Sequence, residues 1–180
     1  MSKILVNELA HTNDTTAMTI DSSGNVAMSQ ASVDFWRLTA NFASNATITG
    51  WERPDDGFNA SINGVTESSG VFTFTKTGLY LINVAVWGQN ATTADGSFGA
   101  QLKVSNNNGS SYDALAVTYS GDSDTGSNNG SSMQGLINVT NISTFKFLIE
   151  ATSLASGTTI RGATDQNYTH FSSIKLAPAQ

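Results

Sequence analysis

Two aspartates separated by one residue are the part of this chain whose spacing comes closest to a metal site. Asp122 and Asp124 alternate with small polar residues, and Gly126 follows them. Carboxylate oxygens placed in this way are the hard ligands that Ca²⁺ takes in acidic loops. The full calcium loop is absent, because the glycine stands at another position and no bidentate glutamate follows. We expect a solvated loop here, and keep Asp122 and Asp124 as weak calcium candidates.

The residues that could carry acid–base or nucleophilic catalysis do not form a coherent set. Asp55 and Asp56 resemble a carboxylate pair, but adjacent side chains of a strand point in opposite directions, and the flanking proline and glycine favour a turn. His11 and His170 are the only imidazoles, and neither stands near a nucleophile elbow. For His170 we expect a packing or interface contact. We predict that the protein is not an enzyme and takes no cofactor.

Tryptophan offers a different chemistry, because aromatic faces stack on the apolar C–H patches of sugar rings. The chain has three tryptophans, at positions 36, 51 and 87. Trp87 ends a long apolar strand and is expected in the core. Trp51 lies beside a glycine and a charged turn, so we take Trp51 as the candidate for glycan contact.

The composition excludes several classes of protein. Charged residues make up 12% of the 180 residues, about half of the roughly 25% that is usual, and Thr, Ser, Asn and Gly replace them. The net charge is −6 with few, scattered Lys and Arg, which argues against nucleic acid as a partner. No apolar run is long enough to span a bilayer, so membrane insertion is not expected. There is no cysteine, which excludes disulfides and thiol chemistry.

The chain has two regions that differ in their pattern of apolar and turn residues. Residues 1–30 contain two apolar clusters separated by turn residues, and they are too short to bury these clusters alone. This segment is therefore expected to anchor the protein to a particle or to sister chains. Residues 31–180 show many short strands with frequent turns, which is typical of a sandwich or barrel. The anchoring candidates are Ile4, Leu5, Val6, Met18 and Ile20.

One predicted strand, Leu79 to Trp87, is apolar on both faces. A two-layer sandwich covers only one face of each sheet, so the second face predicts a subunit interface. The sequence does not say which face is which. One face carries Tyr80, Ile82, Val84 and Val86, and the other carries Leu79, Leu81, Ala85 and Trp87.

The segment Gly70–Val84 resembles the hallmark of the complement component 1q globular-head and tumour-necrosis-factor-like family: a strand ending in Phe-Thr, a turn with glycine, then an aromatic strand. Asp56–Asn59 and His170–Leu176 resemble the family's early Phe-Asn segment and closing strand. The resemblance implies an all-β, ten-stranded jelly roll, compact homotrimers, and ligand recognition by outer loops. No collagen-like stalk precedes the head.

The segment Ala17–Val26 resembles the openings of tail-fibre and appendage proteins of tailed phages. With no signal peptide at its start, the chain is expected to be made in the host cytoplasm and exposed on the virion surface. The hypothesis is a bacteriophage virion structural protein: a homotrimeric spike, fibre head or capsid decoration. Its expected partners are itself, other virion proteins through the N-terminus, and host surface glycans through loops 90–97 and 121–132. The alternative is a free lectin-like carbohydrate-binding module.

Overall fold

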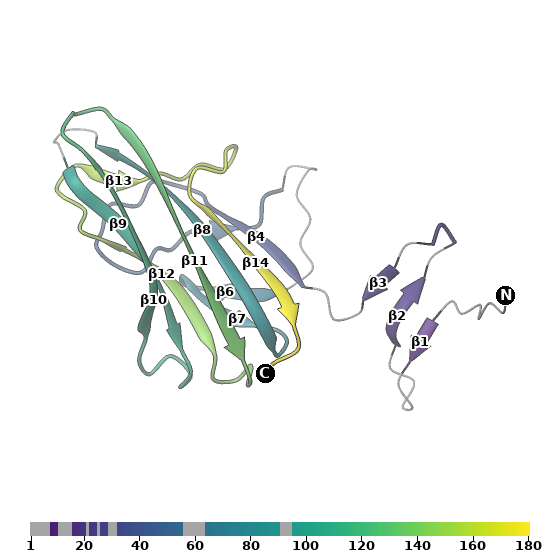
Figure 1. The fold of residues 1–180 in the computed structure, drawn as a ribbon. Helices are drawn as coiled ribbons and strands as arrows, with labels where there is room; N and C mark the ends of the chain where they lie inside the picture. The colour runs from purple at the N-terminus through teal and green to yellow at the C-terminus, as the bar shows by residue number, and fades with distance from the viewer. Residues whose placement is uncertain are drawn as a thin grey trace. The chain divides into compact units, whose positions relative to one another are not determined.

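The computed structural model describes residues 8–10, 16–20, 22–24, 26–28, 32–55, 64–90 and 95–180. The chain divides into two compact units, Met1–Ala31 and Ser32–Gln180. Every regular element among the described residues is a strand (Figure 1). No helix in this part of the chain has the length and apolarity needed to cross a membrane.

The first unit contains a small antiparallel sheet in the order β1-β2-β3. Its strands are β1 (Glu8–Ala10), β2 (Thr16–Ile20) and β3 (Val26–Met28). Gly24 in the β2–β3 turn has a φ of 83°, a conformation that glycine adopts without strain. Met18 and Ile20 lie in β2, whereas Ile4, Leu5 and Val6 lie outside the described residues. The anchoring role of this unit stays a prediction.

The second unit is a head built from two antiparallel sheets (Figure 1). The first sheet has the order β11-β8-β14-β4-β5, and its strands are β4 (Val33–Leu38), β5 (Trp51–Glu52), β8 (Gly78–Asn90), β11 (Asn128–Val139) and β14 (His170–Ala177), with β13 (Thr158–Ile160) paired to the end of β8. The second sheet has the order β10-β9-β12-β7-β6, and its strands are β6 (Val65–Ser68), β7 (Val71–Phe74), β9 (Asp95–Ser105), β10 (Asp113–Asp122) and β12 (Lys146–Thr152). The ten strands in these two orders confirm the predicted jelly roll.

The hairpin between β6 and β7 shows how local sequence directs this fold. Its two-residue loop is Ser69–Gly70, and both residues have positive φ, 53° and 83°. Such loops suit the twist of antiparallel strands and favour small residues and glycine. A Cβ on Gly70 would also lie 2.5 Å from the carbonyl oxygen of Ile48. Glycine is therefore required here by both conformation and space.

The core lies between the sheets and centres on Phe72 of β7. The Phe72 ring lies 4.9 Å from that of Phe147 on β12, and 4.7 Å from that of Phe171 on β14 in the facing sheet. Trp36 and Trp51, also from the facing sheet, approach it edge-on at 5.5 and 6.0 Å. Offset and edge-on aromatic contacts of this kind add to the free energy of simple burial. The cluster therefore joins the two layers.

The prediction that Trp51 contacts a glycan is wrong. Trp51 is only 6% exposed, and its ring packs edge-on against Phe72 and Phe171. Its indole Nε1 donates a hydrogen bond of 2.8 Å to the carbonyl oxygen of Ile48. The ring has no open face on which a sugar could stack. Trp51 closes the edge of the core.

Replacing Phe72 by alanine should lower the free energy of unfolding by about 3–5 kcal/mol, because it removes the ring at the centre of the aromatic cluster and leaves a cavity. Urea unfolding at fixed protein concentration measures the loss. The control is Ile142→Ala in the β11–β12 turn, where Ile142 is 40% exposed and the change should stay within about 0.5 kcal/mol. A loss below about 1 kcal/mol for Phe72→Ala would contradict the central role of this ring.

Candidate functional site: the outer face of the six-stranded sheet

The alternation of β8 separates a core face from a surface face. Tyr80, Ile82, Val84 and Val86 are at most 2% exposed and belong to the core. Leu79, Leu81 and Ala85 are half-buried, and Trp87 is 38% exposed. The two predicted sets of residues therefore lie on opposite faces. The expectation that Trp87 is a core residue is wrong, because it belongs to the outward set.

The pairing of the strands places apolar side chains side by side across this outer face. Leu81 pairs with Leu136 of β11 on one side and with Ile174 of β14 on the other, and Ile174 pairs with Val33 of β4. Leu136 and Leu176 are 55% and 53% exposed. We call these five residues, from four adjacent strands, the apolar row: Leu136, Leu81, Ile174, Val33 and Leu176.

A polar row follows along the same strands. Asn83 pairs with Gln134 of β11 and with Ser172 of β14, and its side-chain Nδ2 donates to the Ser172 hydroxyl at 3.4 Å. Ser172 pairs in turn with Phe35 of β4. Three polar side chains and one aromatic ring therefore border the apolar row.

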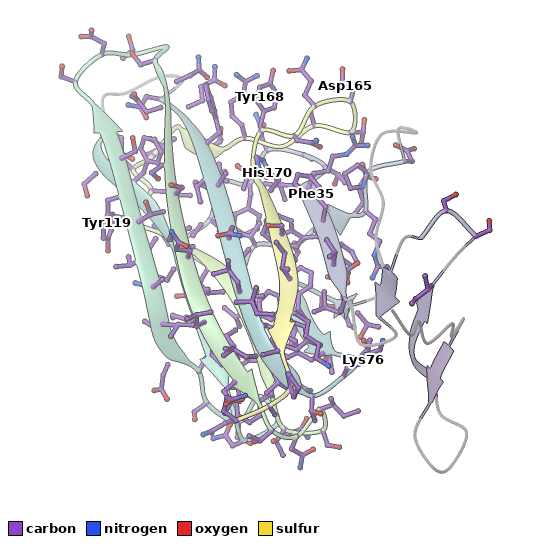
Figure 2. The ribbon with its side chains drawn as sticks, turned by 45° about the vertical axis from the view of Figure 1, so that its right-hand side comes forward. Phe35, Lys76, Tyr119, Asp165, Tyr168 and His170 are labelled. Atoms are coloured by element: carbon purple, nitrogen blue, oxygen red, sulfur yellow. The ribbon has the colours of Figure 1, made fainter. Side chains whose placement is uncertain are left out.

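Beyond the polar row lies an aromatic cluster. The rings of Trp87 and Tyr168 are 6.3 Å apart, and the His170 ring stacks on Phe35 at 5.0 Å (Figure 2). Gly130 pairs with Trp87 across β11 and β8, and a Cβ there would lie 3.2 Å from the Trp87 ring. The indole therefore lies over the glycine. The expected packing contact of His170 is present.

Sequence reasoning missed Tyr168 and Arg161 at this end. Both precede β14 in an irregular segment, and the guanidinium of Arg161 lies 4.2 Å from the centre of the Tyr168 ring. Nothing in the local sequence marks this pair, since seven positions separate the residues and no strand period links them. The only sign of this pair in the sequence is Tyr168 itself, which stands two residues before His170 of the predicted closing strand.

The other edge of the face is closed by a buried arginine. Arg37 on β4 is 1% exposed, and its Nε and Nη2 lie 2.8 Å from a Glu52 oxygen and 2.9 Å from an Asp55 oxygen. Burial by itself lowers the pKa of Arg37, but hydrogen bonds and charge from Glu52 and then Asp55 raise it above its ordinary value. Asp55 therefore serves an ion pair. Asp56, its predicted turn neighbour, lies outside the described residues.

The opposite side of β4 carries a buried carboxylate. Asp34 is fully buried and accepts hydrogen bonds from Arg53 Nε at 2.8 Å and from the backbone N–H groups of Gly64 and Val65. Arg53 also lies 4.4 Å over the Trp36 ring and donates to the Val65 carbonyl oxygen at 2.6 Å. A buried charge is tolerated when it is paired and hydrogen-bonded in this way. The cluster fixes the segments after β5 and before β6 against β4.

Three other groups titrate away from their ordinary values because of burial. Burial raises the pKa of Tyr80, whose hydroxyl donates to the Lys76 carbonyl oxygen at 2.9 Å, and it raises the pKa of Tyr112. Burial, and then the nearby charge of Lys76, lowers the pKa of Lys175. None of these groups lies beside the aromatic cluster.

A second apolar surface lies on β10, at the edge of the other sheet. Leu115, Val117 and Tyr119 are 43–50% exposed, and Figure 2 shows Tyr119 on this strand. The pairing of β10 with β9 shifts register between Ala114 and Ala116 and again between Ser120 and Asp122. Asp122 is the last residue of β10, and Asp124 is exposed in the turn after it. Among the residues that the structure describes, no three His, Cys, Asp or Glu side chains gather around a metal position, so calcium binding stays a prediction.

Of the comparisons with known proteins, the one with solved structures gives matches. No family model matches the chain, and no curated protein matches its sequence. Among solved structures, the Eiger TNF of S. frugiperda superposes with a TM-score of 0.62 at 12% identity, covering 83% of this chain and 95% of that one. Murine APRIL at pH 8.0 gives 0.58 at 12% identity, covering 82% and 100%, and at pH 5.0 it gives 0.57 at 15% identity, again covering 82% and 100%.

The head has the TNF fold. This confirms the fold implied by the resemblance of Gly70–Val84, and at these identities it concerns the fold alone. The TNF-like head presents one sheet face with an apolar row and an aromatic cluster, together with an apolar edge strand. This arrangement is suited to binding and assembly.

The loop end of the head, where β8 ends and β9 begins, is held by Asp95. Its carboxylate accepts hydrogen bonds from the N–H groups of Ala155 at 2.8 Å and Ser97 at 3.1 Å. Burial by itself raises the pKa of Asp95, but these backbone hydrogen bonds lower it below its ordinary value of 3.8. Because the folded pKa is depressed, Asp95 stabilises the fold above about pH 4, and this stability is lost as the pH falls through the folded pKa.

Replacing Asp95 by asparagine should lower the unfolding free energy at pH 7 by about 1.5–3 kcal/mol, the range for hydrogen bonds to a charged group. The gap between variant and native protein should narrow as the pH falls below about 4, because the native carboxylate becomes protonated as the pH passes through its folded pKa. Urea unfolding at several pH values measures both effects. Asp165→Asn, an exposed position, is the control. Parallel pH profiles for the Asp95 variant and the native protein would contradict this role.

Proposed function

We propose that the protein is a structural component of a bacteriophage virion, a homotrimeric head that is attached to the particle through residues 1–30. The observation that carries the assembly part of this proposal is the apolar row. Single exposed apolar residues are common on protein surfaces. In the apolar row, the exposed Leu136, Leu176 and Val33 lie together with two half-buried residues across four strands, and contiguous apolar patches mark interaction sites.

We expect a second copy of the same chain to cover the apolar row. The apolar row lies on a sheet face, whereas the β10 patch lies on the edge of the other sheet, so the chain carries two different apolar surfaces. When one surface of a copy contacts a different surface of the next copy, the contact is heterologous and closes into a ring if the rotation permits. The resemblance to complement 1q and TNF-like heads makes a ring of three copies the expected outcome.

The attachment part of the proposal rests on the first unit. Its sheet has strands of three, five and three residues, and a unit of this size cannot bury enough apolar surface to be stable alone. It is therefore suited to packing on another protein. The resemblance of Ala17–Val26 to phage appendage openings names the kind of particle.

A free lectin-like module is the second candidate. It is favoured by the exposed Trp87 next to Tyr168, because exposed aromatic rings are the surfaces on which sugars stack. The two candidates differ in whether residues 1–30 are needed for localisation, and the same head could serve in either.

Replacing Leu136 by aspartate should dissociate the trimer, because it places a charge at the most exposed position of the apolar row, which would be buried in the contact. Sedimentation velocity at micromolar concentration should show the native protein at three times the chain mass and the variant as a monomer. Ile142→Asp changes an exposed residue outside both apolar surfaces and should leave the trimer intact. A monomeric native protein would contradict the proposed assembly.

Removing residues 1–30 should abolish attachment to the particle while leaving the head folded, because the two units are separately compact. The full-length and shortened proteins are added to particles that lack the native protein, and the particles are then collected on a density gradient. Full-length protein should co-sediment with the particles, and the shortened form should stay at the top. Equal recovery of both forms, or of neither, would contradict attachment through this segment.

A further inference from the structure

A shallow groove follows β8 along the outer face of the six-stranded sheet. At one end, Leu81 and Gln134 line a hollow of about 470 Å³. Gln134 also lines the next hollow, of about 370 Å³, together with Asn83 and Ala85. Ala85 in turn lines a third hollow, of about 410 Å³, at Trp87. Because neighbouring hollows share lining residues, they form one continuous groove from Leu81 to Trp87.

The apolar row is too small to hold a subunit contact by itself. Four adjacent strands span roughly 15–20 Å, and one row of side chains is about 7 Å wide, so the row has a flat footprint of roughly 100–150 Å². A stable contact takes about 800 Å² from each partner. Extending the contact to Trp87 adds six positions of β8, or roughly 20 Å, and makes the footprint several times larger. A second copy bound on the apolar row therefore has to cover the groove as well.

The exposed side chains of β10 have a spacing that matches this groove. Leu115, Val117 and Tyr119 stand two positions apart, which places them roughly 7 Å from one another along the strand. All three are 43–50% exposed. A Cβ on Gly99 would lie 2.8 Å from the Tyr119 ring, so the ring lies over this glycine. The strand therefore presents three apolar side chains in series, as the groove presents three hollows.

The height of Leu115 along the strands follows from its neighbour on β11. A Cβ on Gly135 would lie 2.6 Å from the Leu115 side chain, and Gly135 pairs with Ile82 of β8. Leu115 therefore stands at the height of Ile82, next to Leu81 and the first hollow.

The height of Tyr119 follows from contacts at the other end of β10. Tyr119 pairs with Gly99 of β9. The preceding residue, Phe98, has its ring directly against Gly88 of β8, where a Cβ would not fit. Tyr119 therefore stands near the height of Trp87 and the third hollow. This order also means that β10 runs in the same direction as β8.

A closed ring of copies brings residues of equal height together. Such a ring is generated by rotation alone, because a contact that does not close gives an open helical filament. The groove lies on a sheet face and β10 lies on the edge of the other sheet, so rotation about an axis along the strands can bring one against the other. Leu115 of one copy then meets the hollow at Leu81 of the next, and Tyr119 meets the hollow at Trp87.

The hollow at Trp87 suits a tyrosine side chain. The rings of Trp87 and Tyr168 border it and offer aromatic contacts. Nδ1 of His170 lies 2.9 Å from the carbonyl oxygen of Asn167. A carbonyl oxygen only accepts, so Nδ1 carries the proton, and Nε2 of the neutral ring is an acceptor. The hollow therefore supplies the hydrogen-bond partner that a buried tyrosine hydroxyl needs.

We propose that the groove binds β10 of the neighbouring copy, with Leu115, Val117 and Tyr119 in its three hollows in that order. Tyr119 fills the hollow at Trp87, and its hydroxyl donates to Nε2 of His170. The inference rests on the proposed trimer and gives its contact a register. It leaves Trp87 covered in the trimer, which separates it from the lectin-like candidate.

The chain has no cysteine, so single introduced cysteines report contacts without background. Chains that carry one cysteine each are co-expressed in pairs and treated with a short bismaleimide, and the two-chain products are measured on a denaturing gel. Tyr119→Cys should link to Ser132→Cys, and Leu115→Cys should link to Leu136→Cys, because the members of each pair stand at similar heights. In the two crossed pairs the cysteines are displaced by about four positions, or roughly 13 Å, and should not link.

Tyr119→Ala should weaken assembly at least tenfold, since aromatic residues in the middle of a contact carry much of its binding energy. Tyr119→Phe keeps the ring and should lie between the alanine variant and the native protein. Ile142→Ala removes a side chain that is 40% exposed, outside both surfaces, and should assemble like the native protein. Sedimentation velocity over a series of concentrations measures the dissociation constant of each.

The outcomes separate the register from the trimer itself. Linking of the matched pairs alone, together with a weakened Tyr119→Ala oligomer, supports the register. Linking of the crossed pairs, or native assembly of Tyr119→Ala, overturns it. A native trimer in which no pair links overturns the register and leaves the proposed assembly standing, whereas a monomeric native protein overturns both. Sugar binding by the intact trimer that Trp87→Ala abolishes also overturns the register, because Trp87 would then be open.

Discussion

The alternation of side chains along β8 is the constraint on which both the core and the surface of the head depend. A strand places successive residues on opposite faces, so a shift of one residue would exchange its entire buried and exposed sets. Tyr80, Ile82, Val84 and Val86 must face the other sheet, and this requirement leaves Leu81 and Trp87 on the outside. The neighbouring strands then decide what surrounds each outward residue. Leu81 receives apolar neighbours and Trp87 receives a glycine, which is why one face carries two different surfaces.

The chain has few charged residues, and two of them are buried in ion pairs that hold one segment in place. Asp34 and Arg37 occupy opposite faces of β4, and both are buried with partners from the segment that follows β5. Burying ions costs free energy that good geometry only offsets, so these pairs act mainly by fixing where that segment lies. Their effect is to close the sheet edge beside Trp36, over whose ring Arg53 lies.

The sequence predicted the strands and the two faces of β8 because alternation is a local property of neighbouring residues. It could not assign Trp51 and Trp87 correctly, because each stands next to a glycine and the local patterns look alike. What separates them is distant in the chain: Phe72 and Phe171 cover Trp51, whereas Gly130 leaves Trp87 open. The same limit applies to the Arg161–Tyr168 stack and to the ion pair of Arg53 with Asp34. The apolar row depends on strand register, which no single segment encodes.

The two register shifts of β10 limit how far strands from other molecules could add to this edge of the sheet. An edge strand with exposed apolar side chains is a template on which the backbone of another molecule could add, and repeated addition produces fibrils. The irregular positions around Leu115 and Gly121 leave only residues 116–120 as an uninterrupted ladder, and bulges of this kind bend and twist an edge away from straight pairing. The strand can then offer its side chains to a neighbour without offering a continuous row of amide groups, which favours a finite assembly over an endless sheet.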